Sequence, residues 1–410
     1  MNKLGRIAGL IVALTGCVSD GKDGADGADG ATGAAGAAGA DGADGAAGAA
    51  GAAGAQGPQG PAGPELALPG LYTLANATTG NQVATYLRAS NGNLSRNGGY
   101  ATNGKGLGAG LGSQGALVFD DASQRFFAVN AGDDSISMLG IDASGELSAI
   151  ATVPSGGKRP VSITVHDGTV YVANQGELTA ATVGANISGF QVKGNTLVPI
   201  AGSIQPLSGT TDVHPTDIAF TPDGGFLVVV ERFVNKLDTF KVVAGVAQAG
   251  QFQASSGKQP FAFDFSPEGN LVVAEVGDGS AHGSSVSSYA ISEAGALTPI
   301  TAALPTLQGA ACWLVMAGGY AYIANAATAN LTGVVVSETG ELTLRDAGGI
   351  TAVTGAGATD LAVSPDRGYL YSLAGGAHTI NPFTIHPDGS LTALPALPGV
   401  STTAVGLAVR

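Results

Sequence analysis

A strand pattern that recurs seven times from residue 71 onward constrains the fold of this chain most strongly. Short β-branched and aromatic runs alternate with clusters of Gly, Pro, Asp and Asn, which is the pattern of strands joined by turns. One unit runs from His214 to Glu231 around a Pro-Asp-Gly turn at 222–224, and then continues from Lys236 to Val242. It predicts a strand A, a tight turn, a strand B, a loop, a strand C and a short strand D.

The two ends of this repeated region are incomplete in a complementary way. A strand A precedes every strand B except the first, while residues 404–410 have the pattern of a strand A with nothing after it. The seven strands B are expected at 71–76, 126–130, 170–174, 226–231, 271–275, 320–325 and 369–374. A ring explains both ends, because the last strand then completes the first sheet and leaves no open edge. The predicted fold is all-β: a seven-bladed β-propeller over residues 71–410, closed by its C-terminal strand.

Glycine falls at every third position from Gly21 to Gly63, fifteen times without a break. Only glycine fits the crowded axis of three polyproline-II-like chains, so residues 21–65 are predicted to form a collagen-like stalk. Proline occurs in only three triplets and five aspartates repel one another. A disordered Gly/Ala spacer therefore stays open as the alternative. A triple helix would make the protein a homotrimer.

The N-terminus has the pattern of a secretory signal. Lys3 and Arg6 precede an apolar run at 7–14, which is far shorter than the ~20 residues that span a bilayer. The segment 14–17, Leu-Thr-Gly-Cys, resembles the bacterial lipobox, whose cysteine is acylated. We expect residues 1–16 to be a lipoprotein signal peptide and 17–20 a lipidated N-terminus anchored through Cys17, with an ordinary secretory signal as the alternative. Several acyl chains give stable membrane anchoring.

Composition and motifs exclude several classes of function. The formal net charge is −14, and no basic stripe is present that would bind a nucleic-acid backbone. The five histidines lack ligand spacing, and we expect neither a metal nor a cofactor. The segment 110–115 matches GxGxxG, but it precedes a strand and is expected to be a loop.

The repeated units resemble a known family. The Phe-Thr-Pro-Asp-Gly segment at 220–224, the apolar strand B after it and the Ala-Asn ending of several strands are similar to lactonase-type seven-bladed β-propellers. That family includes enzymes like 6-phosphogluconolactonase and carboxymuconate cyclase, and secreted members without a known activity. The stretches 108–117, 153–161 and 310–313 are similar to one such secreted subgroup. The resemblance covers residues 71–410.

The resemblance also implies where catalytic residues would stand. Active members commonly carry Pro-Arg-His at the start of a strand A and Asn-Glu at the end of the next strand B. Here those positions read Pro215-Thr216-Asp217 and Glu231-Arg232, so no catalytic residue is assigned. We expect a lipid-anchored protein of the bacterial envelope, at the outer membrane because residue 18 is not aspartate, whose propeller binds a ligand. Lactone hydrolysis or cyclisation and a purely structural spacer are the alternatives.

Loop lengths indicate which face carries the binding site. The A–B turns are all tight, whereas the B–C and D–A connections include long loops that meet on the opposite face. We call this the long-loop face and expect a glycan, lactone or protein ligand there. Hairpin register places Pro215 opposite Glu231, so that His214 lies near Arg232 on this face.

Five further side chains complete the candidate set. Phe261 is expected opposite Glu275, with His282 in the adjoining loop. Glu231 and Glu275 replace the Asn that ends most strands B, so they either accept the same backbone hydrogen bonds, which we favour, or hold a cation or share a proton. Cys312 and Trp313 begin a strand that lines the channel, where one of them could face the central funnel or both could pack in the core.

Overall fold

The computed structural model describes residues 66–177, 184–209 and 212–410. The predicted signal peptide, Cys17 and the whole predicted stalk at residues 21–65 lie outside these residues. Regular structure in the described part consists of β-strands, and no helix there is long and apolar enough to cross a membrane.

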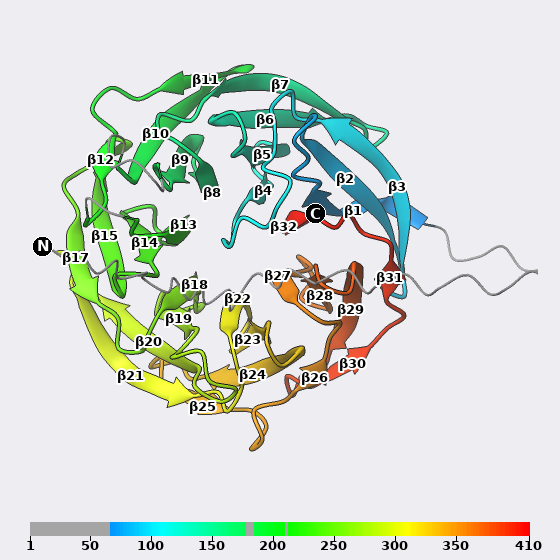
Figure 1. Cartoon of the computed structure of the whole chain (residues 1–410), viewed down its shortest axis with the longest axis vertical. Helices are drawn as coiled ribbons and strands as arrows, with labels where there is room; N and C mark the ends of the chain where they lie inside the picture. The colour runs from blue at the N-terminus through cyan, green and yellow to red at the C-terminus, as the bar shows by residue number, and fades with distance from the viewer. Residues whose placement is uncertain (1–65, 178–183, 210–211) are drawn as a thin grey trace, which may run out of the picture.

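Seven antiparallel sheets surround a common centre and form a ring (Figure 1). Blades 1 and 2 contain β32 (Val405–Val409), β1 (Leu66–Leu74), β2 (Gln82–Ala89) and β3 (Leu94–Ala101), then β4 (Leu117–Asp120), β5 (Arg125–Asn130), β6 (Ser135–Ile141) and β7 (Leu147–Pro154). Blades 3 and 4 contain β8 (Pro160–His166), β9 (Thr169–Asn174), β10 (Asn186–Lys193), β11 (Thr196–Pro199) and β12 (Gln205–Pro206), then β13 (Pro215–Phe220), β14 (Phe226–Glu231), β15 (Lys236–Val243), β16 (Val246–Ala247) and β17 (Gln251–Ala254).

The remaining blades continue in the same order around the ring. Blade 5 contains β18 (Pro260–Phe265), β19 (Leu271–Glu275), β20 (Ser285–Ile291) and β21 (Leu297–Pro305). Blades 6 and 7 contain β22 (Ala311–Ala317), β23 (Tyr320–Asn325), β24 (Asn330–Val336), β25 (Leu342–Leu344) and β26 (Ala352–Val353), then β27 (Ala358–Val363), β28 (Tyr369–Ala374), β29 (Thr379–Ile385), β30 (Leu391–Ala393) and β31 (Leu397–Pro398). In blades 3, 4, 6 and 7 two short strands pair with strand C in place of one long strand D.

The C-terminal strand closes the ring as predicted. β32 pairs antiparallel with β1, with Leu71 opposite Val409 and Leu74 opposite Val405. Residues from both ends of the propeller, which we call the head, therefore share blade 1 (Figure 1). β1 begins earlier than expected and ends at Leu74, two residues before the predicted end, where Asn76 turns into the left-handed region with φ +52°.

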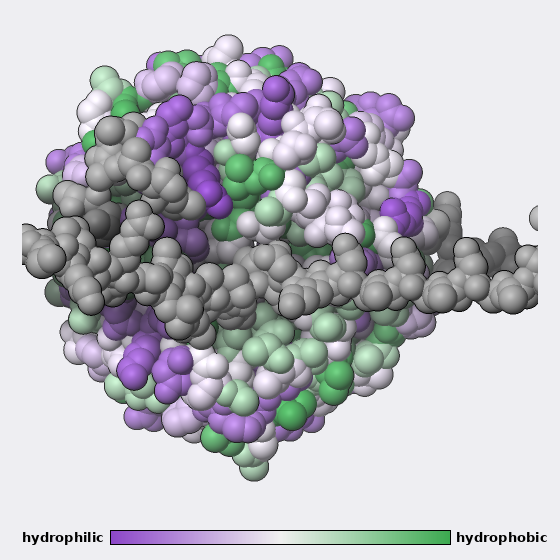
Figure 2. All heavy atoms as spheres, in the orientation of Figure 1, coloured by the Kyte–Doolittle hydropathy of each residue, from purple (hydrophilic) through white to green (hydrophobic). Residues whose placement is uncertain are grey.

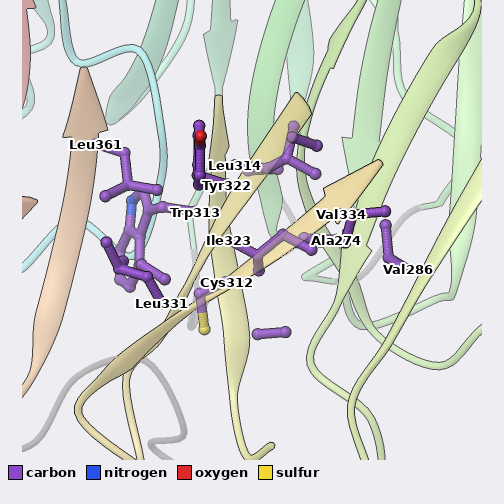
Figure 3. Packing of buried hydrophobic residues seen from close by; sticks show 14 of the residues in the cluster. Ala274, Val286, Cys312, Trp313, Leu314, Tyr322, Ile323, Leu331, Val334 and Leu361 are labelled. Carbon is purple, nitrogen blue, oxygen red and sulfur yellow. The ribbon is translucent and has the colours of Figure 1, made fainter. Parts of the chain in front are cut away.

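Strands B from β5 to β28 are buried at every residue or at all but the first, because the faces of each sheet pack against two neighbouring blades. All six residues of β14 are buried, which explains its nearly continuous apolar sequence. The largest apolar cluster joins blades 5, 6 and 7 and is shown in part in Figure 3. Stability therefore depends on packing between blades as well as within each sheet.

The register of blade 5 differs from the prediction by one residue. Glu275 lies opposite Pro260, not Phe261, because a β-bulge follows Pro260 and pairing resumes at Ala262. The same irregularity follows the first residue of strand A in blades 3, 4, 6 and 7. A bulge adds one unpaired residue, which alternating hydrophobicity does not reveal.

The loop between β3 and β4 enters the centre of the ring. The Gln114 amide nitrogen donates to the Thr216 carbonyl of blade 4 at 2.8 Å, and its side chain exchanges hydrogen bonds with Leu314 of blade 6. The Ile163 amide of blade 3 donates to the Gly115 carbonyl at 2.9 Å. The GxGxxG segment is thus a loop, as predicted, and it joins strands A from separate blades.

Candidate ligand-binding site

A repeated backbone contact defines the inner edge of the long-loop face. The residue before strand A accepts, through its carbonyl, a hydrogen bond of 2.9–3.1 Å from the amide of the residue after strand B in blades 3 to 6. Each residue before strand A has φ between +52° and +55°. We call these positions the mouth rim: Arg159 and Gln175, His214 and Arg232, Gln259 and Val276, and Ala310 and Ala326.

The mouth rim is polar on one side of the ring only. Blades 3 and 4 and the adjoining Gln259 contribute long polar or charged side chains, whereas blade 6 contributes two alanines and blade 7 has Gly357 before its strand A. On the face drawn in Figure 2, hydrophilic side chains gather over blade 3, and paler or apolar ones cover much of blades 6 and 7. A bound molecule would therefore find its polar partners on blades 3 to 5.

Side-chain hydrogen bonds connect the polar positions across blade boundaries. Gln175 Nε2 lies 2.5 Å from His214 Nδ1, between blades 3 and 4. Arg232 Nε donates to Gln259 Oε1 at 3.1 Å, between blades 4 and 5. Together with the backbone contacts, these bonds form a continuous chain from Arg159 to Gln259.

Arg232 is the most unusual member of this chain. Only 6% of the Arg232 surface is exposed to solvent. No carboxylate in the described residues 66–177, 184–209 and 212–410 forms an ion pair with it. Burial lowers the pKa of the Arg232 guanidinium to about 10. The guanidinium lies 5.5 Å from the Phe233 ring centroid and 5.6 Å from that of Phe261. Cation–π contacts offset part of the cost of removing this charge from water.

His214 and Phe233 form a stacked pair beside the arginine. Their ring centroids are 4.3 Å apart with an interplanar angle of 22°. Phe233 is 54% exposed and presents one flat apolar ring to solvent. The His214 amide donates to Asp212 Oδ1 at 2.9 Å, and Asp212 Oδ2 lies 3.7 Å from His214 Nδ1. Because Gln175 Nε2 can only donate, His214 Nδ1 accepts its hydrogen bond, and the neutral imidazole carries its hydrogen on Nε2.

Two buried polar atoms of the mouth rim have no partner in the described part of the chain. They are Arg159 Nε, a donor, and Gln175 Oε1, an acceptor. Burial lowers the pKa of Arg159, while the Asp212 carboxylate acts in the opposite direction. Buried polar groups in native proteins almost always have partners, so an unpaired donor and an unpaired acceptor at one rim are compatible with a ligand that supplies both.

Glu231 and Glu275 lie behind the mouth rim, and both are fully buried. Glu231 accepts hydrogen bonds from the Ser208 amide at 2.6 Å and from the Ser208 hydroxyl. Asp238 on strand C is the carboxyl beside Glu231, and burial followed by the Glu231 charge raises the pKa of Asp238 well above its usual range. The carboxyl that interacts with Glu231 is therefore Asp238 of the same blade, blade 4.

Glu275 takes the structural place of the asparagines that end other strands B. It accepts hydrogen bonds from the Gly257 amide at 2.8 Å and from three serine hydroxyls, those of Ser255, Ser285 and Ser287. Asn130 in blade 2 likewise contacts two serines of its strand C. Burial raises the pKa of Glu275, against the effect of these donors. In the described part, no group of three His, Cys, Asp or Glu residues is placed to hold a metal ion.

The other predicted residues lie at three different places. Trp313 is 2% exposed, donates from Nε1 to the Ser113 carbonyl at 3.0 Å and packs edge-on against Phe261. Cys312 is fully buried, with its sulfur directed away from the Trp313 indole (Figure 3). His282 is exposed on the blade 5 loop, where Nδ1 donates to the Leu307 carbonyl at 2.8 Å.

Sequence reasoning placed His214 and Arg232 together correctly but missed their neighbours. Arg159, Gln175 and Gln259 occupy the equivalent rim positions of adjacent blades. Aligning the residue before each strand A and the residue after each strand B would have identified them. The bond between Gln175 and His214 could not be inferred, because it depends on the relative placement of two blades.

Comparisons with known proteins agree with this architecture. Residues 186–315 match the family model described as lactonase, seven-bladed β-propeller, and residues 18–67 match collagen triple helix repeats. No curated protein sequence matches the chain significantly.

Solved structures of similar fold include several sugar-lactone proteins. The periplasmic gluconolactonase of Pseudomonas aeruginosa is 18% identical, with a TM-score of 0.64 over 82% of this chain and 98% of that one. A candidate 6-phosphogluconolactonase from Bacteroides uniformis is 17% identical, with a TM-score of 0.65 over 82% and 98%. A protein from Lactobacillus plantarum is 19% identical, with a TM-score of 0.65 over 83% and 99%. The head is thus a seven-bladed β-propeller similar to the lactonase type, and the segment before it is similar to collagen repeats.

Proposed function

We propose that the mouth rim binds a small hydroxylated carboxylate, such as a sugar acid, or the lactone of such an acid. The observation that carries the proposal is Arg232, a 94% buried cation without a carboxylate partner in the described part of the chain. A planar guanidinium forms paired hydrogen bonds with a carboxylate, and in a water-poor site such bonds are strong.

The neighbouring groups match the rest of such a ligand. Gln175 Oε1 is an unpaired acceptor and Arg159 Nε an unpaired donor, as an arrangement of sugar hydroxyls requires. Phe233 offers an exposed ring on which the apolar face of a pyranose can pack. The similarity of fold to a gluconolactonase supports the same ligand class.

Lactone hydrolysis at the same rim is the second candidate function. The Asp212 carboxylate, whose Oδ1 accepts from the His214 amide, would take a proton from water as the water oxygen adds to the lactone carbonyl carbon. Arg232 would stabilise the negative charge that develops on the carbonyl oxygen. The ring C–O bond then breaks, and the alkoxide receives the proton from Asp212. The family pattern is replaced at these positions, so this route uses different residues.

Calorimetric titration of the purified protein tests the binding function. We expect saturable binding of gluconate or galacturonate, and at least tenfold weaker binding by Arg232→Met. Lys241→Ala, an exposed change at the opposite end of strand C, serves as the control and should bind as the wild type does. Equal affinities of the wild type and Arg232→Met would contradict the proposal.

A pH-stat assay with glucono-δ-lactone distinguishes hydrolysis from binding alone. An enzyme should exceed the spontaneous rate and lose most of this excess in Asp212→Asn. Hydrolysis at the spontaneous rate, together with retained binding, would leave the protein a binding module.

We further propose that the head is displayed on the bacterial envelope by lipid on Cys17, through a stalk that assembles three chains. Labelled palmitate should enter the wild type and not Cys17→Ser, and full membrane partitioning of the serine variant would contradict the anchor.

Analytical ultracentrifugation of residues 18–410 should detect trimers at low temperature. Trimers could raise avidity by about 10²–10⁴ where geometry allows, whereas a monomer at micromolar concentration would remove the stalk proposal.

A further inference from the structure

A pocket on blade 5 is lined by loops that adjoin the mouth rim along the chain. It has a volume of about 340 Å³, within the range of small-molecule sites. The D–A loop supplies Ser256, Gly257 and Lys258, and the B–C loop supplies Asp278 and His282 among others. Lys258 immediately precedes Gln259, the rim residue bonded to Arg232. The pocket and the mouth rim are therefore contiguous along the chain.

The pocket presents donors and acceptors side by side. Because His282 Nδ1 donates to the Leu307 carbonyl, its neutral imidazole leaves Nε2 as an acceptor. Lys258 and the Ser256 hydroxyl are donors, and Asp278 is an acceptor carboxylate. Such alternation suits the hydroxyl groups of a sugar, which donate and accept at once.

The fully buried Glu275 fixes the inner wall of this pocket. Its carboxylate accepts hydrogen bonds from the Gly257 amide and the Ser285 hydroxyl, and both Gly257 and Ser285 line the pocket. The Ser256 amide donates to the Tyr289 hydroxyl at 2.7 Å. Anchoring of the consecutive Ser256 and Gly257 amides indicates a pre-formed site, which lowers the cost of ordering on binding.

We infer that this pocket is a second sugar subsite, so that the ligand of the head is an acidic oligosaccharide whose charged unit sits at the mouth rim. The inference rests on the function proposed above. The next sugar unit occupies the pocket, with its hydroxyls bonded by Lys258, Asp278 and His282. The described rim positions of blades 6 and 7 are alanine and glycine, which have no polar side chain.

Calorimetric comparison of a monomer, gluconate, with a dimer, maltobionate, whose second unit is a neutral glucose linked to gluconate, tests the second subsite. The wild-type protein should bind the dimer at least tenfold more tightly than the monomer. Asp278→Ala and Lys258→Ala should reduce dimer affinity to that of the monomer and leave monomer affinity unchanged. Arg232→Met should weaken both ligands, and Lys241→Ala neither.

The possible outcomes separate this inference from the proposed function. The second subsite would be overturned by equal affinities for monomer and dimer, or by pocket variants that keep the preference for the dimer. Either result would leave the proposed binding at the mouth rim intact. A wild-type protein that binds neither acid would overturn both. Unchanged melting temperatures of the pocket variants would establish that lost affinity does not reflect unfolding.

Discussion

Asp264 on strand A of blade 5 accepts a hydrogen bond of 2.8 Å from the backbone amide of Met316 on strand A of blade 6. Asp217 in blade 4 makes the equivalent bond to the Phe263 amide of blade 5, at 3.2 Å. Asp217 is buried and Asp264 is half-buried, and each carboxyl joins two neighbouring blades. Burial raises the pKa of Asp217 to about 8 and that of Asp264 to about 6.

These two carboxyls predict that the head becomes less stable as pH rises. Because their folded-state pKa values exceed the usual 3.8, the native state binds more protons than the unfolded chain between about pH 4 and pH 8. Their stabilisation is complete below pH 4 and is lost as pH rises through 6 and then 8. Calorimetric melting of the protein from pH 5 to pH 8.5 should show a falling melting temperature.

Asp217→Asn tests the residue responsible for this dependence. The amide carries no charge at any pH, and it can still accept from the Phe263 amide and donate to Ser162. We expect the unfolding free energy at pH 8 to exceed that of the wild type by on the order of 1–3 kcal/mol. The melting temperature should therefore be higher at pH 8 and should depend less on pH. A variant that keeps the full wild-type slope would assign the effect to other groups.

Arg232→Met should separate stability from binding. A buried cation without a partner is costly, and an apolar side chain of similar length removes this cost while it keeps the packing against Phe233 and Phe261. We expect an unchanged or higher melting temperature together with the loss of ligand affinity. A melting temperature lower by several degrees would indicate that Arg232 has a structural role that its contacts do not reveal.

Gly257→Ala should damage both the blade 5 pocket and stability. A Cβ at this position would lie 1.8 Å from Glu275 Oε2 and 2.1 Å from its Cδ, and this buried carboxyl is held by four donors. Overpacking of this kind costs about 1–3 kcal/mol, which thermal melting detects. Gly348→Ala is the matched control, because nothing lies within 4 Å of its added Cβ. Equal melting of both variants would contradict the role of Glu275 as a rigid wall.

Removal of residues 401–410 should disrupt the whole head. The deletion takes away β32, which pairs with β1 and buries Leu407 and Ala408. At about 25 cal/mol per Å² of apolar surface, the loss approaches the stability of a typical domain. We expect aggregation or a large fall in melting temperature, whereas removal of residues 1–65 should leave the head folded. A C-terminally truncated protein that melts like the intact chain would contradict closure by β32.

The amino-acid sequence by itself determined the number of blades, the approximate limits of strands B and the closure of the ring. Each of these follows from local alternation of apolar runs and turn residues, and an unmatched strand at each end requires pairing. It also determined that His214 and Arg232 meet, because they flank the two paired strands of one hairpin.

Only the tertiary structure decided which residues of different blades share the mouth rim. Gln175 meets His214 and Arg232 meets Gln259 because ring closure sets the spacing and rotation of neighbouring sheets. The bulge after Pro260 and the burial of Arg232 likewise depend on packing between blades. Strand patterning reports which face of a strand is buried, but it contains no information on which polar side chains are left without a partner.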